Sequence, residues 1–151
     1  SKEEILEQLK NGLHLCYGFL GKDKVKFTDR IYKQTIEGSA IEPYCRIYKD
    51  FVVYGDFDGD GDSDAALVID SYGGGCGTFF ELELFLNNNG TMEWADKLMI
   101  GDRAKINSFK VENGLISLDF IGHGQDDPMC CPTQKMLWIL KLETGKFKIV
   151  G

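Results

Sequence analysis

Apolar and polar residues alternate along much of the chain, and this two-residue period predicts β-strands. The clearest example lies within residues 79–88, where apolar side chains at even positions from 80 to 86 alternate with Glu81 and Glu83. Successive side chains of a strand point to opposite faces of a sheet, so these two sets are expected on different faces. Further strands are expected within residues 14–20, 25–38 (two short strands), 46–57, 91–101, 104–122 and 135–151.

Short turn signals separate several of these strands. Asn89-Gly90 and Asn113-Gly114 are typical of two-residue hairpin turns, and Thr144-Gly145 has the same place in the last segment. Residues 65–72, AALVIDSY, form a short apolar run. This run fits either a buried strand or a short helix, because periodicity alone does not separate the two.

The first ten residues have a different pattern, which predicts one short helix. Ser1 and Glu4 form a capping box, an apolar stripe follows from Ile5 to Leu9, and the helix is expected to end near Asn11. No linker or change of composition divides the chain. The predicted fold is α+β and mainly β: a single domain over residues 1–151, in which a short N-terminal helix precedes an antiparallel β meander of hairpins.

An acidic stretch, GDFDGDGDSD, interrupts the strand pattern at residues 55–64. The spacing of its aspartates, with Gly61 at position 6, is that of a calcium loop, in which positions 1, 3 and 5 supply carboxylates and position 7 a backbone carbonyl. An EF-hand has glutamate at position 12, where this chain has Leu67, and the preceding segment is strand-like. The stretch therefore predicts a Ca²⁺ loop between two strands. The expected metal-binding residues are Asp56, Asp58, Asp60, Asp62 and Asp64.

The alternative is a solvated acidic turn without metal. If metal binds, a structural clamp on the hairpin is expected, and a role in catalysis or in bridging to a partner is the alternative. The 151-residue chain has a formal net charge of -7, and the five aspartates supply most of it. No basic run exists to bind nucleic acid or an anionic membrane, and no apolar run reaches the ~18 residues of a transmembrane segment.

Four segments extend the pattern beyond the acidic loop. In order along the chain, they are GDFDGDGDSDAALVI, GGGCGTFFELELFLNNNG, IGDRAKINSFKVENGLISLDF and GHGQDDPMCCPT. This succession resembles a family of small, largely uncharacterised bacterial exported proteins and lipoproteins, and the loop itself resembles those of FG-GAP and VCBS repeats. The resemblance implies a calcium loop and export to the periplasm, cell surface or medium, lipid anchoring through a removed N-terminal segment included. It implies no settled activity.

The five cysteines, Cys16, Cys45, Cys76, Cys130 and Cys131, favour an oxidising compartment. The chain begins SKEEILEQLK, which is no signal peptide and is interpreted as a mature or trimmed start. A Cys16–Cys45 disulfide is expected, because both residues lie in strand-like segments of the N-terminal half. For the other three, a vicinal Cys130–Cys131 bridge and a bond from one of them to Cys76 both remain open.

A second group of reactive side chains lies in GHGQDDPMCCPT. A loop held by disulfides is the expected interpretation. The alternative is a hydrolase that uses His123, Asp126 and Cys130, since a histidine can lower the pKa of a thiol. Zinc is a further alternative, although adjacent cysteines lack the spacing of a tetrahedral site. His14 is expected to be structural.

These observations predict a calcium-binding exported accessory or binding module of the bacterial cell envelope. The metal is expected to be structural, and no catalysis is expected. The expected partner is an envelope protein or a glycan. Trp94, Trp138 and the tyrosines are a candidate sugar-binding platform, and the chain is expected to be a monomer.

Overall fold

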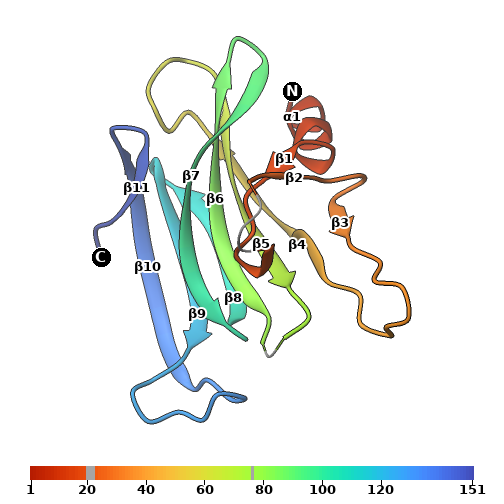
Figure 1. The fold of residues 1–151 in the computed structure, drawn as a ribbon. Coiled ribbons are helices and arrows are strands. Elements are labelled where there is room, and N and C mark those ends of the chain that lie inside the picture. The colour runs from red at the N-terminus through yellow and green to blue at the C-terminus, as the bar shows by residue number, and fades with distance from the viewer. Residues whose placement is uncertain (20–22, 76) are drawn as a thin grey trace.

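The computed structural model describes residues 1–19, 23–75 and 77–151, and strands dominate this part of the chain (Figure 1). The elements, in chain order, are α1 (Lys2–Lys10), β1 (Leu13–His14), the 3-10 helix η1 (Tyr17–Phe19), β2 (Val25–Lys26), β3 (Ile31–Lys33), β4 (Tyr44–Gly55), β5 (Asp64–Tyr72), β6 (Phe79–Asn88), β7 (Thr91–Asp102), β8 (Lys105–Glu112), β9 (Leu115–Gly122), β10 (Gln134–Glu143) and β11 (Lys146–Ile149). The prediction of a mainly β chain with one short N-terminal helix is confirmed.

The strands form two large antiparallel sheets and one small one. The five-stranded sheet has the order β3-β4-β5-β6-β7, the four-stranded sheet has the order β11-β10-β9-β8, and β1 pairs with β2. Within each large sheet every strand pairs with its neighbour in the sequence, as in the expected meander. The meander is not continuous, however, because the chain passes from one sheet to the other between β7 and β8.

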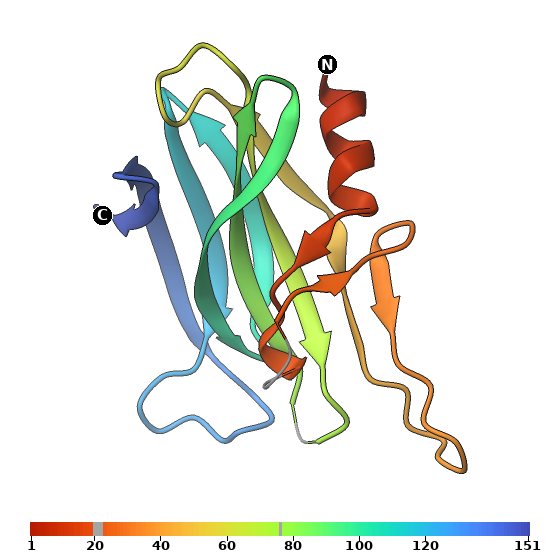
Figure 2. The same cartoon turned by 45° about the horizontal axis from the view of Figure 1, so that its top comes forward.

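The two large sheets pack face to face (Figure 2). Alternate side chains of β5 and β6, among them Val68, Phe80 and Leu82, contact the inner face of the four-stranded sheet, where Leu118 and Phe120 are buried. This first core is the interior of a β-sandwich, formed by one apolar face from each sheet.

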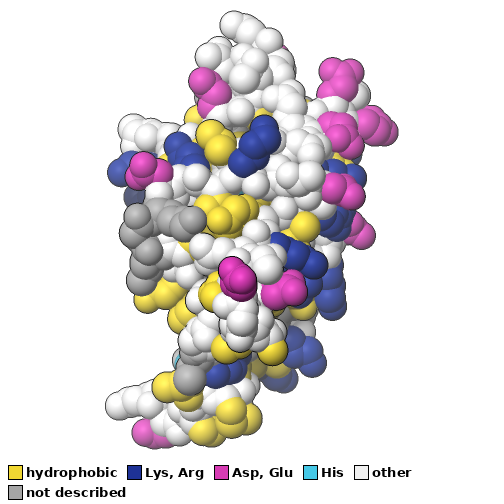
Figure 3. Space-filling model, turned by 45° about the vertical axis from the view of Figure 1, so that its right-hand side comes forward, with side chains coloured by type: hydrophobic (Ala, Val, Ile, Leu, Met, Phe, Trp, Pro, Cys, Tyr) yellow, Lys and Arg dark blue, Asp and Glu magenta, His cyan; other side chains and the backbone are white. Residues whose placement is uncertain are grey.

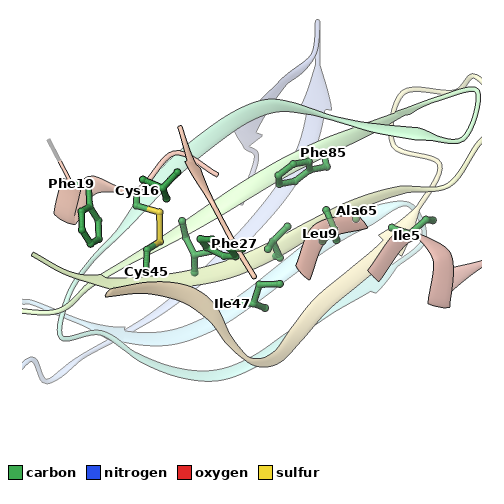
Figure 4. Close-up of a cluster of buried hydrophobic side chains, with 12 residues drawn as sticks. Ile5, Leu9, Cys16, Phe19, Phe27, Cys45, Ile47, Ala65 and Phe85 are labelled. Carbon is green, nitrogen blue, oxygen red and sulfur yellow. A yellow bond between two sulfur atoms is a disulfide. The ribbon is translucent and has the colours of Figure 1, made fainter. Parts of the chain in front are cut away.

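The other face of the five-stranded sheet is covered by the N-terminal segment (Figure 4). Ile5 and Leu9 of α1, together with Phe27, pack over Ile47 of β4 and Phe85 of β6. The result is a three-layer arrangement in which the five-stranded sheet lies in the middle. Because both of its faces are covered, nearly all of β5 is buried, which resolves residues 65–72 as a buried strand.

The local turn and helix signals are confirmed. Ser1 is the N-cap of α1, and its hydroxyl accepts the amide hydrogen of Glu4. Asn89, Asn113 and Thr144 all have positive φ angles, between 49° and 53°, and each precedes a glycine that also has positive φ. Two-residue turns of this kind match the twist of paired strands, and they join β6 to β7, β8 to β9 and β10 to β11.

The expected strand over residues 14–20 is largely wrong. Only Leu13–His14 is a strand, and Tyr17–Phe19 forms a 3-10 turn in which the amide of Phe19 donates to the Cys16 carbonyl. The amide of Gly18 donates to the Ser71 hydroxyl, 3.0 Å away. A local turn and a contact to β5 therefore replace the strand pairing that was expected, and no local sequence pattern predicts the contact to Ser71. Leu20 lies outside the described residues.

Among the described residues, no helix is long and apolar enough to cross a membrane.

Candidate metal centre

The acidic loop joins β4 to β5 at one end of the middle sheet. Its two ends are held together, because Gly55 and Asp64 are cross-strand partners. The loop therefore starts from a fixed base, as the strand–loop–strand prediction requires.

Four of the five predicted ligands come together in this loop. One carboxylate oxygen from each of Asp56, Asp58, Asp60 and Asp64 lies within 4.8 Å of the others. The Asp62 carboxylate is not part of this group. In the loop pattern, position 7 contributes its backbone carbonyl and not its side chain.

Hydrogen bonds from the backbone give the loop its shape. Asp56 accepts from the amides of Gly59 and Gly61, both at 2.9 Å, and of Asp60 at 3.1 Å. Gly59 and Gly61 have φ angles of 78° and 92°, a region that side chains with a Cβ rarely adopt. The loop is thus wrapped around the Asp56 carboxylate, and its glycines permit the sharp turn.

Asp64 anchors the loop to the rest of the sheet. Its side chain is fully buried, and one carboxylate oxygen accepts the amide hydrogens of Phe57 at 2.8 Å and Asp58 at 3.3 Å. The other oxygen accepts the amide hydrogen of Asn87, at 2.9 Å, at the end of β6. The Asn87 side chain donates a second hydrogen bond, of 3.0 Å, to the Ser63 carbonyl, so the loop and the end of β6 are joined twice.

The carboxylates differ in how readily they ionise. Backbone donors, first that of Gly61, lower the pKa of Asp56. Desolvation raises the pKa of Asp58 from 3.8 to about 6, and the charges of Asp64 and Asp60 add to the shift. Burial likewise raises the pKa of Asp64. Gathering these groups therefore costs free energy when they are all ionised, and a cation between them would offset that cost.

The donor set fits a hard divalent cation. All four gathered donors are carboxylate oxygens, and three of the four residues are exposed, which gives an ion access from solvent. Calcium takes six to eight oxygen ligands in flexible geometry, so Asp56, Asp58, Asp60 and Asp64 would hold it, with a backbone carbonyl and water completing the shell.

Arg103 lies in the turn between β7 and β8, and Asp102 and Met129, its two side-chain partners, lie outside the acidic loop. Its guanidinium forms an ion pair with Asp102 at 2.8 Å and donates to the Met129 carbonyl at 3.1 Å. The ion pair lies at the β7–β8 turn, and the second contact reaches the β9–β10 loop.

The second predicted group of side chains, between β9 and β10, is a hydrogen-bonded loop. His123 donates from Nε2 to the Met129 carbonyl at 2.9 Å, as expected for a histidine that bonds within its own loop. Cys130 is joined to Cys131 by a disulfide, so the hydrolase alternative lacks a thiol in this state. Asp126 is exposed, and the loop is organised by its neighbour Asp127.

The cysteine pairing resolves the alternatives left open by the sequence. The Cys16–Cys45 disulfide is present, and it joins the N-terminal layer to β4 (Figure 4). The second disulfide is the vicinal Cys130–Cys131 bridge. The alternative bond to Cys76 involves a residue that lies outside the described residues.

Trp94 and Trp138 do not form one sugar-binding platform. Trp94 packs against the core beneath the N-terminal segment, and its indole donates to Glu83 at 2.9 Å. Trp138 packs edge-on against Phe120, in the core between the two large sheets. The two indoles thus belong to different layers.

The middle sheet also carries a buried polar network that the sequence pattern did not predict. His14 and Glu83 are both fully buried and in contact, and Glu81, also buried, forms an ion pair with Lys97 at 2.9 Å. Two acidic residues within the strongly apolar β6 are the only sequence signal of this network. The structural role expected for His14 is consistent with these contacts.

Searches of protein-family models, of curated proteins and of solved structures find no match to this chain.

Proposed function

We propose that this chain is a calcium-binding accessory or binding module, exported to the bacterial cell envelope, in which the metal is structural. The single observation that carries the proposal is the gathering of the Asp56, Asp58, Asp60 and Asp64 carboxylates within 4.8 Å of one another. A chain gains little by crowding like charges at one loop unless a cation neutralises them. Calcium is the expected ion because the donors are hard oxygens in a flexible loop.

A structural role is supported by the way the loop is tied to the sheet. Asp64 lies between the loop amides of Phe57 and Asp58 and the amide of Asn87. An ion bound to Asp64 would therefore hold β4, β5 and the end of β6 together. This arrangement favours a clamp on the end of the sheet over a reaction centre.

Two disulfides support the proposed location. Cys16–Cys45 joins elements that are 29 residues apart, and Cys130–Cys131 lies at the surface. Disulfides persist in the periplasm and outside the cell, and they are rare in the reducing cytosol. The resemblance to exported bacterial proteins and lipoproteins points to the same compartment, where the proposed partner is an envelope protein or a glycan.

Calorimetric titration of the chelator-treated chain with Ca²⁺ tests the metal site. We expect one site with a Kd on the order of 10⁻⁴–10⁻³ M, the range of extracellular calcium modules. Asp58→Ala should abolish the binding signal. Asp50→Ala removes one carboxylate from an exposed position outside the loop and should leave the signal unchanged.

Two outcomes would contradict the proposal. Wild-type protein that gives no heat of binding and no shift in melting temperature with millimolar Ca²⁺ has no such site. Equal weakening by Asp58→Ala and Asp50→Ala would show only a diffuse attraction between Ca²⁺ and an acidic protein.

A further inference from the structure

The loop between β9 and β10 carries a disulfide between adjacent residues, Cys130 and Cys131. Both cysteines are exposed, and the preceding Met129 is 66% exposed. The loop projects beyond the sheets at the lower end of the molecule in Figure 1, and Figure 3 shows hydrophobic side chains gathered at that end. The sulfurs therefore lie where another molecule can reach them.

The Cys16–Cys45 disulfide differs in each of these respects. Its two cysteines are buried, and they are 29 residues apart in the sequence. A cross-link stabilises a fold by restricting the unfolded chain, and this effect grows with the length of the closed loop. A bond between adjacent residues closes almost no loop, so Cys130–Cys131 contributes far less to stability by this route.

Other contacts already hold the β9–β10 loop. Asp127 accepts from the amides of Gly124 at 2.8 Å and Thr133 at 2.7 Å, and from the Thr133 hydroxyl at 2.7 Å. The Met129 carbonyl accepts from Arg103 at 3.1 Å and from His123 at 2.9 Å. The Asp127 and Met129 contacts flank the disulfide and do not include it. The hydrogen bonds that order the loop therefore do not involve the two sulfurs.

We propose that Cys130–Cys131 is a thiol–disulfide exchange site whose substrates are thiols, and in particular dithiols of a partner protein. Exposed disulfides are more readily reduced than buried structural ones, and exchange depends on access of a thiolate to one sulfur. This chain offers one disulfide of each kind. The difference between them indicates that the vicinal bond is the reactive one.

The exchange is written in two steps. A thiolate of the partner attacks Sγ of one cysteine of the pair, an S–S bond forms between partner and loop, and the Cys130–Cys131 bond breaks with its electron pair going to the other cysteine as thiolate. The second thiolate of the partner then attacks the partner's sulfur in the mixed disulfide. The S–S bond between partner and loop breaks, and its electron pair goes to the loop cysteine as thiolate. The partner leaves oxidised to a disulfide, and the loop keeps the two electrons as a dithiol, with its protons taken from water.

The test uses the full chain as the Cys76→Ser variant, so that no fifth thiol takes part. The protein is equilibrated in buffers of reduced and oxidised glutathione, free thiols are alkylated, and each cysteine peptide is quantified by mass spectrometry. We expect Cys130–Cys131 to become reduced at a concentration of reduced glutathione at least about tenfold lower than Cys16–Cys45 requires, with the melting temperature nearly unchanged.

A second variant captures the intermediate. With Cys131→Ser added, Cys130 has no adjacent partner, and oxidised glutathione should join to it as a stable mixed disulfide, detected as a mass increase on the Cys130 peptide. Three results would overturn the proposal: Cys130–Cys131 that resists reduction as strongly as Cys16–Cys45, reduction of the vicinal bond that unfolds the chain, and a Cys130 that takes up no glutathione in folded protein.

Discussion

Nδ1 of His14 lies 2.5 Å from Oε1 of Glu83, and both side chains are fully buried between the N-terminal layer and the middle sheet. The other ring nitrogen of His14 donates to the Leu9 carbonyl at 2.7 Å. Because a carbonyl oxygen only accepts, this nitrogen carries a proton. Glu83 also accepts from the Leu15 amide at 3.2 Å and the Trp94 indole at 2.9 Å, so the contact is a hydrogen-bonded pair that joins α1, β1, β6 and β7.

Substitution of Glu83 tests the importance of this pair. Glu83→Leu replaces the carboxylate by an apolar side chain of similar volume, so the Leu15 amide and the Trp94 indole lose their acceptor and His14 loses its partner. Removing one partner of a buried pair costs about 3–5 kcal/mol, so the free energy of unfolding in urea should fall by that amount. Glu93→Gln, an exposed change on β7, should stay within about 0.5 kcal/mol. Equal effects of the two variants would contradict a structural role for the pair.

The acidic loop should make stability depend on pH and calcium together. The pKa of Asp58, ordinarily 3.8, is raised to about 6, so the folded chain without metal prefers the protonated carboxyl. The stabilising contribution of Asp58 to the free energy of unfolding is therefore present at low pH, and it is lost as the pH rises from about 4 to above 6. In chelator, the melting temperature of wild type relative to Asp58→Asn should fall over this range. With Ca²⁺, the melting temperature of wild type relative to Asp58→Asn should instead rise over this range, because the ion binds the ionised carboxylate.

Asp50→Asn is the control for the loss of one negative charge. The difference in melting temperature between Asp50→Asn and wild type should respond little to Ca²⁺, because the Asp50 side chain forms an exposed ion pair with Arg30. If Ca²⁺ left the pH dependence of Asp58→Asn relative to wild type unaltered, Asp58 would not be a ligand.

The two disulfides should differ in their effect on stability. In the chain-entropy model, a cross-link over about 30 residues contributes on the order of 3–4 kcal/mol, and one between adjacent residues about 1 kcal/mol. The double variant Cys16→Ala/Cys45→Ala should therefore lose several times more unfolding free energy than Cys130→Ala/Cys131→Ala. Mapping of non-reduced peptides checks the pairing first, and five free thiols would refute both the pairing and the argument for export.

Asp127 should control the local order of the β9–β10 loop. The pKa of Asp127 is lowered by the Gly124 amide and by the hydroxyl and amide of Thr133, so the folded loop favours the carboxylate. The stabilisation of the loop by this carboxylate should be lost as the pH falls through the folded-state pKa of Asp127. Asp127→Ala should speed hydrogen exchange of the Gly124 and Thr133 amides. Asp126→Ala, one residue away and exposed, is the matched control and should leave their exchange rates unchanged. Equal acceleration by both variants would show that Asp127 has no special role.

Features encoded over a few neighbouring residues could be predicted from the sequence. The cap of α1 at Ser1, the hairpin turns at Asn89, Asn113 and Thr144, and the wrapping of the loop around Asp56 all depend on local backbone preferences and short-range hydrogen bonds. The spacing of the aspartates is likewise a feature of neighbouring residues. Four of the five predicted ligands therefore come together, while Asp62 takes the position whose carbonyl the pattern uses.

Only the tertiary structure decided what covers each face of the middle sheet. The alternation in β6 separates Leu82 from Glu83 but does not say that the face of Glu83 is also buried. That burial depends on α1 and His14 folding back over strands about 70 residues away in the sequence. The change of sheet after β7 likewise depends on packing between distant segments. Alternation and turn residues act over a few positions, whereas the pairing of layers is set by the apolar area that the whole chain buries.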